Sequence, residues 1–152
     1  MIQRIQTVYL FLSLTVIGLM FVFPYAFFLD TAAVKYVFDF SGVRQAGTGE
    51  MVTGILPFQI LLVTVAVINL VTIFLYRNRR LQMRAAVFNM LLMAGLLVLA
   101  GWYIYYAQDE LEAQVYYKAT LLLPLLGMVL TWLAFRNILK DELLVRSADR
   151  IR

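Results

Sequence analysis

Four long apolar runs restrict how this chain of 152 residues can fold more than any other feature of its sequence. They cover about residues 5–29, 56–76, 85–107 and 117–139, and charges occur only near the ends of the last run. As a helix, each run is long enough to cross a hydrocarbon layer of about 30 Å. None has the polar face of a helix on the surface of a soluble protein. The sequence therefore predicts an all-α membrane protein whose single domain is a four-transmembrane-helix bundle.

The composition agrees with a membrane protein and argues against an enzyme. Hydrophobic residues make up 63% of the chain and charged residues 14%, whereas soluble domains are about 45–50% apolar and about 25% charged. The chain lacks cysteine and histidine, which removes the commonest general base and metal ligand. No nucleophile–base pair, metal-ligand set or phosphate-binding glycine loop is recognisable. We therefore expect a non-enzymatic protein with no catalytic residue, metal or cofactor.

The basic residues are distributed unevenly between the two sides of the predicted bundle. The outer side carries only Lys35, Arg44 and Lys118. The other side carries ten basic residues: Arg4, Arg77, Arg79, Arg80, Arg84, Arg136, Lys140, Arg146, Arg150 and Arg152. Because basic residues are retained on the cytoplasmic side, this asymmetry predicts an inner-membrane protein with both termini in the cytoplasm.

Four of these arginines follow one another closely between the second and third apolar runs, at Arg77, Arg79, Arg80 and Arg84. We expect them to face anionic lipid headgroups, where each basic residue contributes on the order of 1 kcal/mol. Contact with nucleic acid is the alternative for such a cluster, and we do not expect it here. The cluster thus predicts a lipid contact on the cytoplasmic side.

The outer loop, about residues 30–55, is the largest segment outside the apolar runs. Tyr36, Phe38 and Phe40 alternate with more polar neighbours, which is typical of a strand, and Ser41-Gly42 is a turn signal. The loop therefore has two open interpretations, a small β-hairpin or a flexible segment. At the other side, the tail of residues 140–152 is expected to continue the last helix into the cytoplasm.

The deepest strongly polar side chains in the apolar runs are Asn69 and Asn89. They belong to two helices joined by a short connection. We hypothesise that these amides hydrogen-bond across the helix pair or to a nearby backbone carbonyl. Such a contact stabilises the helix pair by about 0.6–2 kcal/mol.

The two ends of the chain carry a family resemblance. The opening Met1-Ile2-Gln3-Arg4-Ile5-Gln6-Thr7 and the closing Arg146-Ser147-Ala148-Asp149-Arg150, placed around four apolar runs, resemble a family of small inner-membrane proteins of the Bacteroidota. That family is designated domain of unknown function 4293, and the resemblance covers the whole chain. It implies four spans and an inner-membrane location, and it implies no substrate, cofactor or reaction.

Both of these ends are predicted on the cytoplasmic side, so they can meet. We hypothesise that they form a cytoplasmic cap or a partner contact, and the alternative is that each end only satisfies the constraints of membrane insertion. The residues of this hypothesis are Gln3, Arg4, Gln6, Arg146, Asp149 and Arg150.

Two functions remain open after this reading of the sequence. The first is an accessory or scaffold subunit of a larger assembly, whose partners are membrane lipids and another inner-membrane protein, with a homo-oligomer left open. The second is a binder or carrier of a lipid or other apolar small molecule. A cavity of about 300 Å³ or more would favour the second function.

Overall fold

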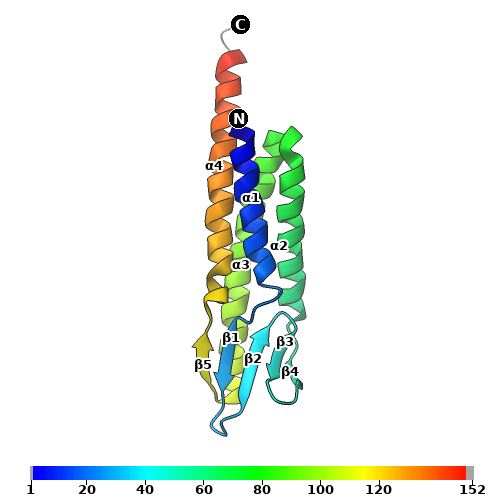
Figure 1. Ribbon diagram of the computed structural model, residues 1–152, viewed down its shortest axis with the longest axis vertical. Helices are drawn as coiled ribbons and strands as arrows, with labels where there is room; N and C mark the ends of the chain where they lie inside the picture. Colours follow the sequence, from blue (N-terminus) through cyan, green and yellow to red (C-terminus); the bar gives the residue numbers. More distant parts are fainter. Residues whose placement is uncertain (1, 150–152) are drawn as a thin grey trace.

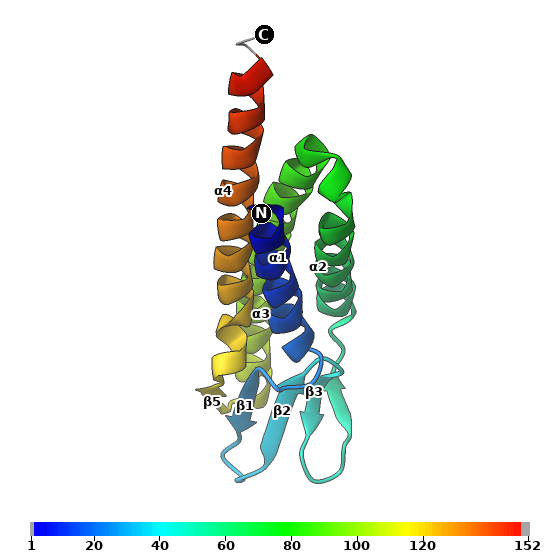
Figure 2. The same cartoon turned by 45° about the horizontal axis from the view of Figure 1, so that its top comes forward.

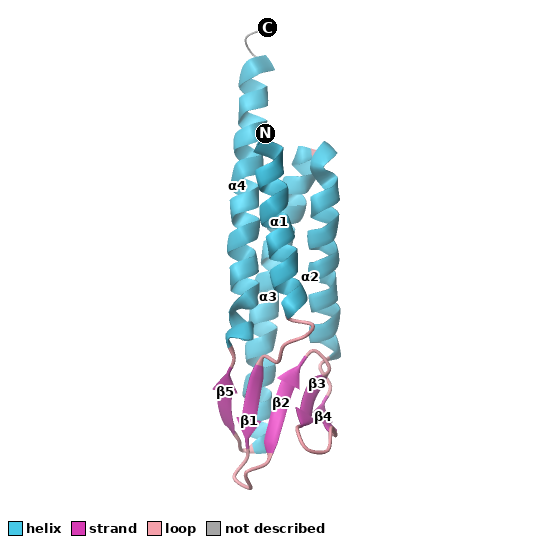
Figure 3. Ribbon diagram, viewed as in Figure 1, coloured by secondary structure: helices cyan, strands magenta, loops and turns pink. Residues whose placement is uncertain are grey.

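The computed structural model describes the backbone of residues 2–149 and the side chains of residues 5–143. Within this part of the chain, long helices form a bundle and a β-sheet lies at one end of it (Figure 1, Figure 3). We call this end the sheet end. The opposite end, where α2 passes into α3, is called the turn end.

Four helices build the bundle: α1 (Ile2–Leu19), α2 (Leu56–Phe74), α3 (Arg79–Leu111) and α4 (Leu123–Asp149). Short 3₁₀ helices, η1 (Leu75–Arg77) and η2 (Ala119–Leu122), connect α2 to α3 and precede α4. α1 packs against α4 and α2, and α3 packs against the same two helices. α1 begins and α4 ends toward the turn end, where α4 extends beyond its neighbours (Figure 2).

Five short strands form one antiparallel sheet in the order β4-β3-β2-β1-β5. Their bounds are β1 Ala26–Leu29, β2 Lys35–Asp39, β3 Gly42–Gln45, β4 Met51–Thr53 and β5 Gln114–Tyr117. Ala26 of β1 lies opposite Phe38 of β2 and Tyr117 of β5. The sheet therefore joins the segment after α1 to the segment between α3 and α4.

The predicted all-α, four-transmembrane-helix bundle is wrong. The structure combines its helices with a five-stranded sheet. Among the described residues, three helical segments are long and apolar enough to cross a membrane: Leu56–Arg77, Arg79–Leu111 and Ala119–Leu143. The apolar part of α1, Ile5–Leu19, is shorter. The reason is that α1 ends at Leu19, and the last residues of the first apolar run form β1 instead.

The end of the first apolar run is buried by the sheet rather than by an extended helix. Pro24 precedes β1, and a proline has no backbone N–H with which to continue a helix. Tyr25, Ala26 and Phe28 are fully buried. A continuous apolar run is typical both of a membrane helix and of a strand buried in a core, so its hydrophobicity does not separate the two.

The inner face of the sheet packs on the last turns of α3, which pass behind the strands in Figure 1. Ile104 and Ala107 of α3 belong to the same buried cluster as Phe28, Phe38 and Val43. α3 has 33 residues and is therefore roughly 50 Å long. It has enough length to line the bundle and still support the sheet.

Three aromatic rings join the sheet to the bundle. The Tyr25 ring lies 5.0 Å from Phe38 and 5.3 Å from Phe58, measured between ring centres. The Tyr25 hydroxyl donates a hydrogen bond of 2.6 Å to the carbonyl of Met20. Burial raises the pKa of Tyr25 well above its usual value, and the nearby Asp39 carboxylate raises it further. The hydroxyl therefore keeps its proton and remains a donor.

The segment predicted as a hairpin or a flexible loop is a folded part of the sheet. β2 and β3 pair directly, with Asp39 opposite Gly42 at the turn, and the Asp39 carboxylate accepts a hydrogen bond from the Ser41 backbone N–H at 2.7 Å. Gly42 has φ +137°, and a Cβ there would lie 2.9 Å from the carbonyl oxygen of Thr53. This turn therefore requires glycine.

Candidate functional site

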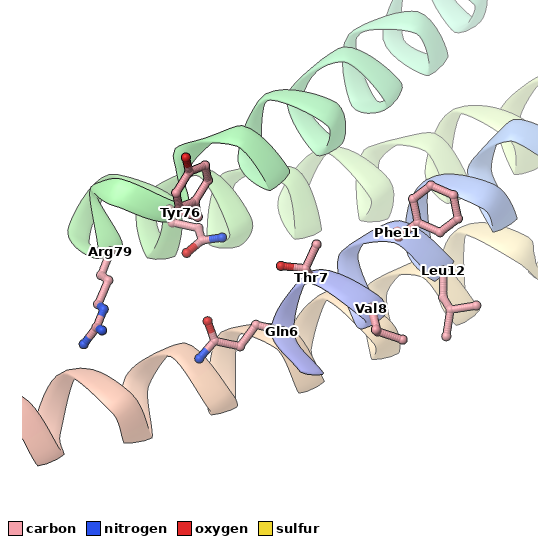
Figure 4. A pocket seen from close by; sticks show the side chains of 8 residues that line it. Gln6, Thr7, Val8, Phe11, Leu12, Tyr76 and Arg79 are labelled. Atoms are coloured by element: carbon pink, nitrogen blue, oxygen red, sulfur yellow. The ribbon is translucent and has the colours of Figure 1, made fainter. Parts of the chain in front are cut away.

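A groove opens at the turn end between α1 and the start of α3 (Figure 4). It has a volume of about 530 Å³. This volume exceeds the 300 Å³ or so that a ligand pocket needs. We call it the turn-end groove. Its polar lining comes from Gln6, Thr7, Tyr76, Arg79 and Gln82.

One wall of the turn-end groove is apolar and open to the outside. Val8, Phe11 and Leu12 of α1 form it, and these side chains are 54%, 61% and 44% exposed. Figure 4 shows them following α1 away from the polar residues at its start. The groove therefore has a polar part near the start of α1 and an apolar part further along α1. This arrangement suits an amphipathic ligand.

Gln6 stands out among the polar residues because its side chain is only 6% exposed. Its amide Nε2 has no hydrogen-bond partner among the described residues. By contrast, the Gln82 side chain, also on the groove, donates a hydrogen bond of 3.1 Å to the carbonyl of Thr72. A buried donor without a partner costs about 1–3 kcal/mol. Gln6 is thus a donor available to an acceptor placed in the groove.

One member of the arginine cluster, Arg79, lines the same groove, and ion pairs tie the cluster to α4. Arg79 lies 3.1 Å from the carboxylate of Asp141, and Arg80 lies 3.7 Å from that of Glu142. Arg77 and Arg84 form no ion pair among the described residues and are exposed. Arg79, Arg80 and Arg84 belong to the first turns of α3 rather than to a loop. The turn end keeps an excess of positive charge beside the groove.

Deeper in the bundle, polar side chains from three helices form a connected cluster. Asn69 of α2 donates a hydrogen bond of 2.9 Å to the hydroxyl of Ser13 on α1. The Ser13 hydroxyl lies 2.9 Å from that of Thr131 on α4, and both hydroxyls donate to the carbonyl of Gly127. Ser13, Asn69 and Thr131 are fully buried. The cluster therefore fixes α1 between α2 and α4.

Asn89 is equally buried, but neither polar atom of its side chain has a partner among the described residues. The structure thus does not show the hypothesised amide contact between α2 and α3. Asn69 does bond to another helix, but its partner is Ser13, and the structure does not join Asn69 to Asn89 or to a backbone carbonyl. Ser13 was the residue that sequence reasoning missed.

The cytoplasmic-cap hypothesis falls mostly on residues whose side chains the structure does not describe. Gln3 and Arg4 lie in α1, and Arg146 and Asp149 lie in α4, but these side chains are outside the described residues, as is all of Arg150. Gln6 is described and faces the turn-end groove. The hypothesis therefore stays a prediction.

Aromatic residues near the end of α3 and in β5 point mainly outward. Trp102, Tyr106 and Tyr117 are 53%, 46% and 66% exposed. The Trp102 ring contacts Tyr106 edge-on, at 6.1 Å between ring centres. Such exposed rings are typical of a membrane interface. None of these three rings lines the turn-end groove.

The turn-end groove was not predicted, although one signal in the sequence pointed to it. Gln82, Ala86 and Asn89 are spaced i, i+4 and i+7 and are all buried, so they share one face of α3. Because the segment around Gln82 was interpreted as a loop, this face was not recognised. A helix begun at Arg79 would have placed Gln82 on the bundle side.

The fold and groove define a class of protein: a bundle that includes three helices apolar enough to cross a membrane, with a small antiparallel sheet at one end and a polar-headed groove at the other. The chain belongs to the family described as a domain of unknown function (DUF4293), whose model matches residues 2–151. Family membership, expected from the two terminal motifs, is thereby confirmed. A comparison with curated proteins gives no match.

Proposed function

We propose that the protein is a multi-pass protein of a bacterial inner membrane, from a member of the Bacteroidota, with the turn end in the cytoplasm. The three long apolar segments support membrane insertion, because only 22–28% of their most apolar windows is buried inside the molecule. The remaining apolar surface needs an apolar solvent. The basic turn end supports the orientation, and the terminal motifs support the bacterial group.

We propose further that the protein binds one lipid in the turn-end groove and is not an enzyme. The observation that carries this proposal is the buried, unpartnered Nε2 of Gln6 at the polar end of a groove with an exposed apolar wall. A lipid supplies both complements, since its headgroup or ester oxygens accept a hydrogen bond and its acyl chain covers Val8, Phe11 and Leu12. Water would be an unfavourable occupant, because it solvates the apolar wall poorly.

The charge beside the groove favours an anionic headgroup. Arg79 lines the groove and is balanced by Asp141, whereas Arg77 and Arg84 lack an ion pair among the described residues. An anionic lipid would therefore meet net positive charge at the headgroup level. Each basic residue there attracts an anionic headgroup by on the order of 1 kcal/mol. The predicted contact between Arg77, Arg79, Arg80, Arg84 and anionic lipid belongs to this proposal.

The test compares the lipid that co-purifies with the full chain and with two groove variants, measured by native mass spectrometry in a mild detergent. Gln6→Leu removes the free donor, and Val8→Trp fills the groove without removing a hydrogen bond. We expect Gln6→Leu to retain about tenfold less lipid, the effect of losing one charge-assisted hydrogen bond of about 1.5 kcal/mol. Val8→Trp should also retain less lipid, because its ring occupies the space of the ligand. Gln108→Leu, at an exposed position of α3, is the matched control.

Retention of the same lipid by both groove variants would contradict the lipid proposal. The accessory-subunit function, with another inner-membrane protein or a second copy as partner, would then become the better proposal. A stoichiometric protein in the same purification, in place of the lipid, would support it directly. Lipid binding is placed first because of the unpartnered Gln6 donor beside the apolar wall of the groove.

A further inference from the structure

The outer face of the sheet, away from α3, carries a second feature that lipid binding at the turn end does not use. Ala26 and Phe28 of β1 point into the buried core, and Phe27 and Leu29 alternate with them. Phe27 is opposite Val37 and Tyr116, and Leu29 is opposite Lys35. Because cross-strand partners share a face of the sheet, these residues lie together on its outer face.

The three basic residues assigned to the outer side differ in whether their charge is balanced. Arg44 forms an ion pair with Asp39. Lys35 and Lys118 have no ion pair among the described residues, and both are exposed. Their ammonium nitrogens lie 4.2 Å and 4.7 Å from the centre of the same ring, that of Phe27. Two unbalanced positive charges therefore contact a single aromatic ring.

These two lysines line a hollow of about 440 Å³, which we call the sheet-face hollow. Aromatic and aliphatic side chains form the rest of its lining, and no carboxylate is among them. Tyr116 and Tyr117, on its rim, are 52% and 66% exposed. Lys118 immediately precedes η2 and α4. The hollow thus extends over the sheet from the start of β2 to the residue that precedes η2 and α4.

The two ammonium groups repel each other, since both lie within 5 Å of one ring centre. Their attraction to the Phe27 ring offsets part of this repulsion, but contacts of this kind are weak at exposed sites. An anion between them would be attracted by both. A phosphate group suits the position, because its several oxygens can accept hydrogen bonds from two ammonium groups at once.

We propose that the sheet-face hollow binds a phosphate group, with Lys35 and Lys118 as its two cationic contacts and Phe27 as the surface between them. The chemistry is that of a phosphate ester, which a lipid headgroup and a soluble phosphate compound share. Tyr116, Tyr117 and Leu29 supply apolar area beside the charge. This site is independent of the turn-end groove and does not depend on the lipid bound there.

The test measures binding to the full chain in an uncharged detergent with two probes. One is a short-chain phosphatidylglycerol and the other is glycerol 3-phosphate, which carries a phosphate ester without acyl chains. We expect Lys35→Gln combined with Lys118→Gln to weaken binding at least about tenfold, a loss of about 1.4 kcal/mol. Lys140→Gln, at an exposed position of α4, is the matched control and should change little. Circular dichroism checks that the double variant is folded.

Each outcome decides the proposal. If both probes bind and depend on the two lysines, the hollow recognises the phosphate itself, and if only the lipid does so, it recognises a headgroup together with its chains. Unchanged binding in the folded double variant, or no binding of either probe to the native chain, would overturn the proposal. Gln6→Leu should leave the lysine-dependent binding intact, which separates this result from a failure of the turn-end groove.

Discussion

At the residue scale, the two buried asparagines of the bundle are chemically identical but have different surroundings. Asn69 donates to Ser13 and holds α1 against α2, whereas Asn89 has no partner for either polar atom among the described residues. A buried amide without any hydrogen bond destabilises a fold. Asn69 makes one with its amide nitrogen, although its Oδ1 has no partner among the described residues. The sequence identified both residues, but their opposite roles depend on Ser13, which lies 56 positions before Asn69.

Replacing each asparagine by leucine should therefore change stability in opposite directions. Asn69→Leu should lower the free energy of unfolding by about 0.6–2 kcal/mol, because an interhelical hydrogen bond is lost. Asn89→Leu should raise it by about 1 kcal/mol, because a buried group without partners is removed. Thermal unfolding of the purified protein in detergent measures both. A loss of stability of similar size in the two variants would contradict this assignment.

Gln6 shows how far a candidate site can be predicted from residue identity alone. The residue was assigned to a cytoplasmic cap because it belongs to the opening motif, and the structure places it on the turn-end groove. Tyr76 and Arg79, which line the groove with it, come from the connection between α2 and α3 and from the start of α3. Only the packing of α1 against the α2–α3 connection brings these residues together, and no local pattern in the sequence encodes that packing.

At the scale of the elements, the helices α2 and α3 could be predicted and the strands β1 and β5 could not. Alternating residues around Phe38 indicated β2, and Ser41-Gly42 indicated the turn that follows it. β1 lies at the end of the first apolar run, where a buried strand shows little alternation, and it was therefore assigned to a membrane helix. The exposed β5 lies almost entirely between the third and fourth runs, where no strand was predicted.

The turn between β2 and β3 gives a test at this scale. Gly42→Ala should destabilise the sheet by on the order of 1–3 kcal/mol, because alanine disfavours the observed φ and its Cβ meets the carbonyl oxygen of Thr53. Gly47→Ala is the control, since a Cβ there has no atom within 4 Å. Urea unfolding followed by the near-ultraviolet signal of the sheet aromatics measures the difference. Equal midpoints for the two variants would rule out a strained turn.

At the scale of the whole molecule, the sheet joins parts of the chain that a simple helical bundle would keep apart. β1 follows α1, and β5 follows α3, yet Leu29 is the register partner of Gln114. This arrangement places the segments before and after two long helices side by side. It also gives the molecule two distinct ends, a folded sheet and a basic turn.

Cysteine pairs can test this arrangement, because the natural chain contains no cysteine. Leu29→Cys combined with Gln114→Cys should form a disulfide on mild oxidation, since directly opposed strand residues lie about 4.5–5.5 Å apart. Leu29→Cys combined with Tyr116→Cys should not, since the diagonal spacing of about 7–8 Å exceeds the reach of the bond. Protease-treated protein on a non-reducing gel distinguishes the two. Efficient linkage of the diagonal pair alone would contradict the register.

The strand order has a consequence for how the protein is made. Strands β1 to β4 are consecutive in the chain, whereas β5 follows only after α2 and α3. Since synthesis delivers the N-terminal part first, a four-stranded sheet can form while the ribosome is still producing α2 and α3. During that interval β1 is an unpaired edge, which invites pairing with the wrong strand. Arrival of β5 covers that edge, so the sheet is completed only shortly before α4, the last helix, is synthesised.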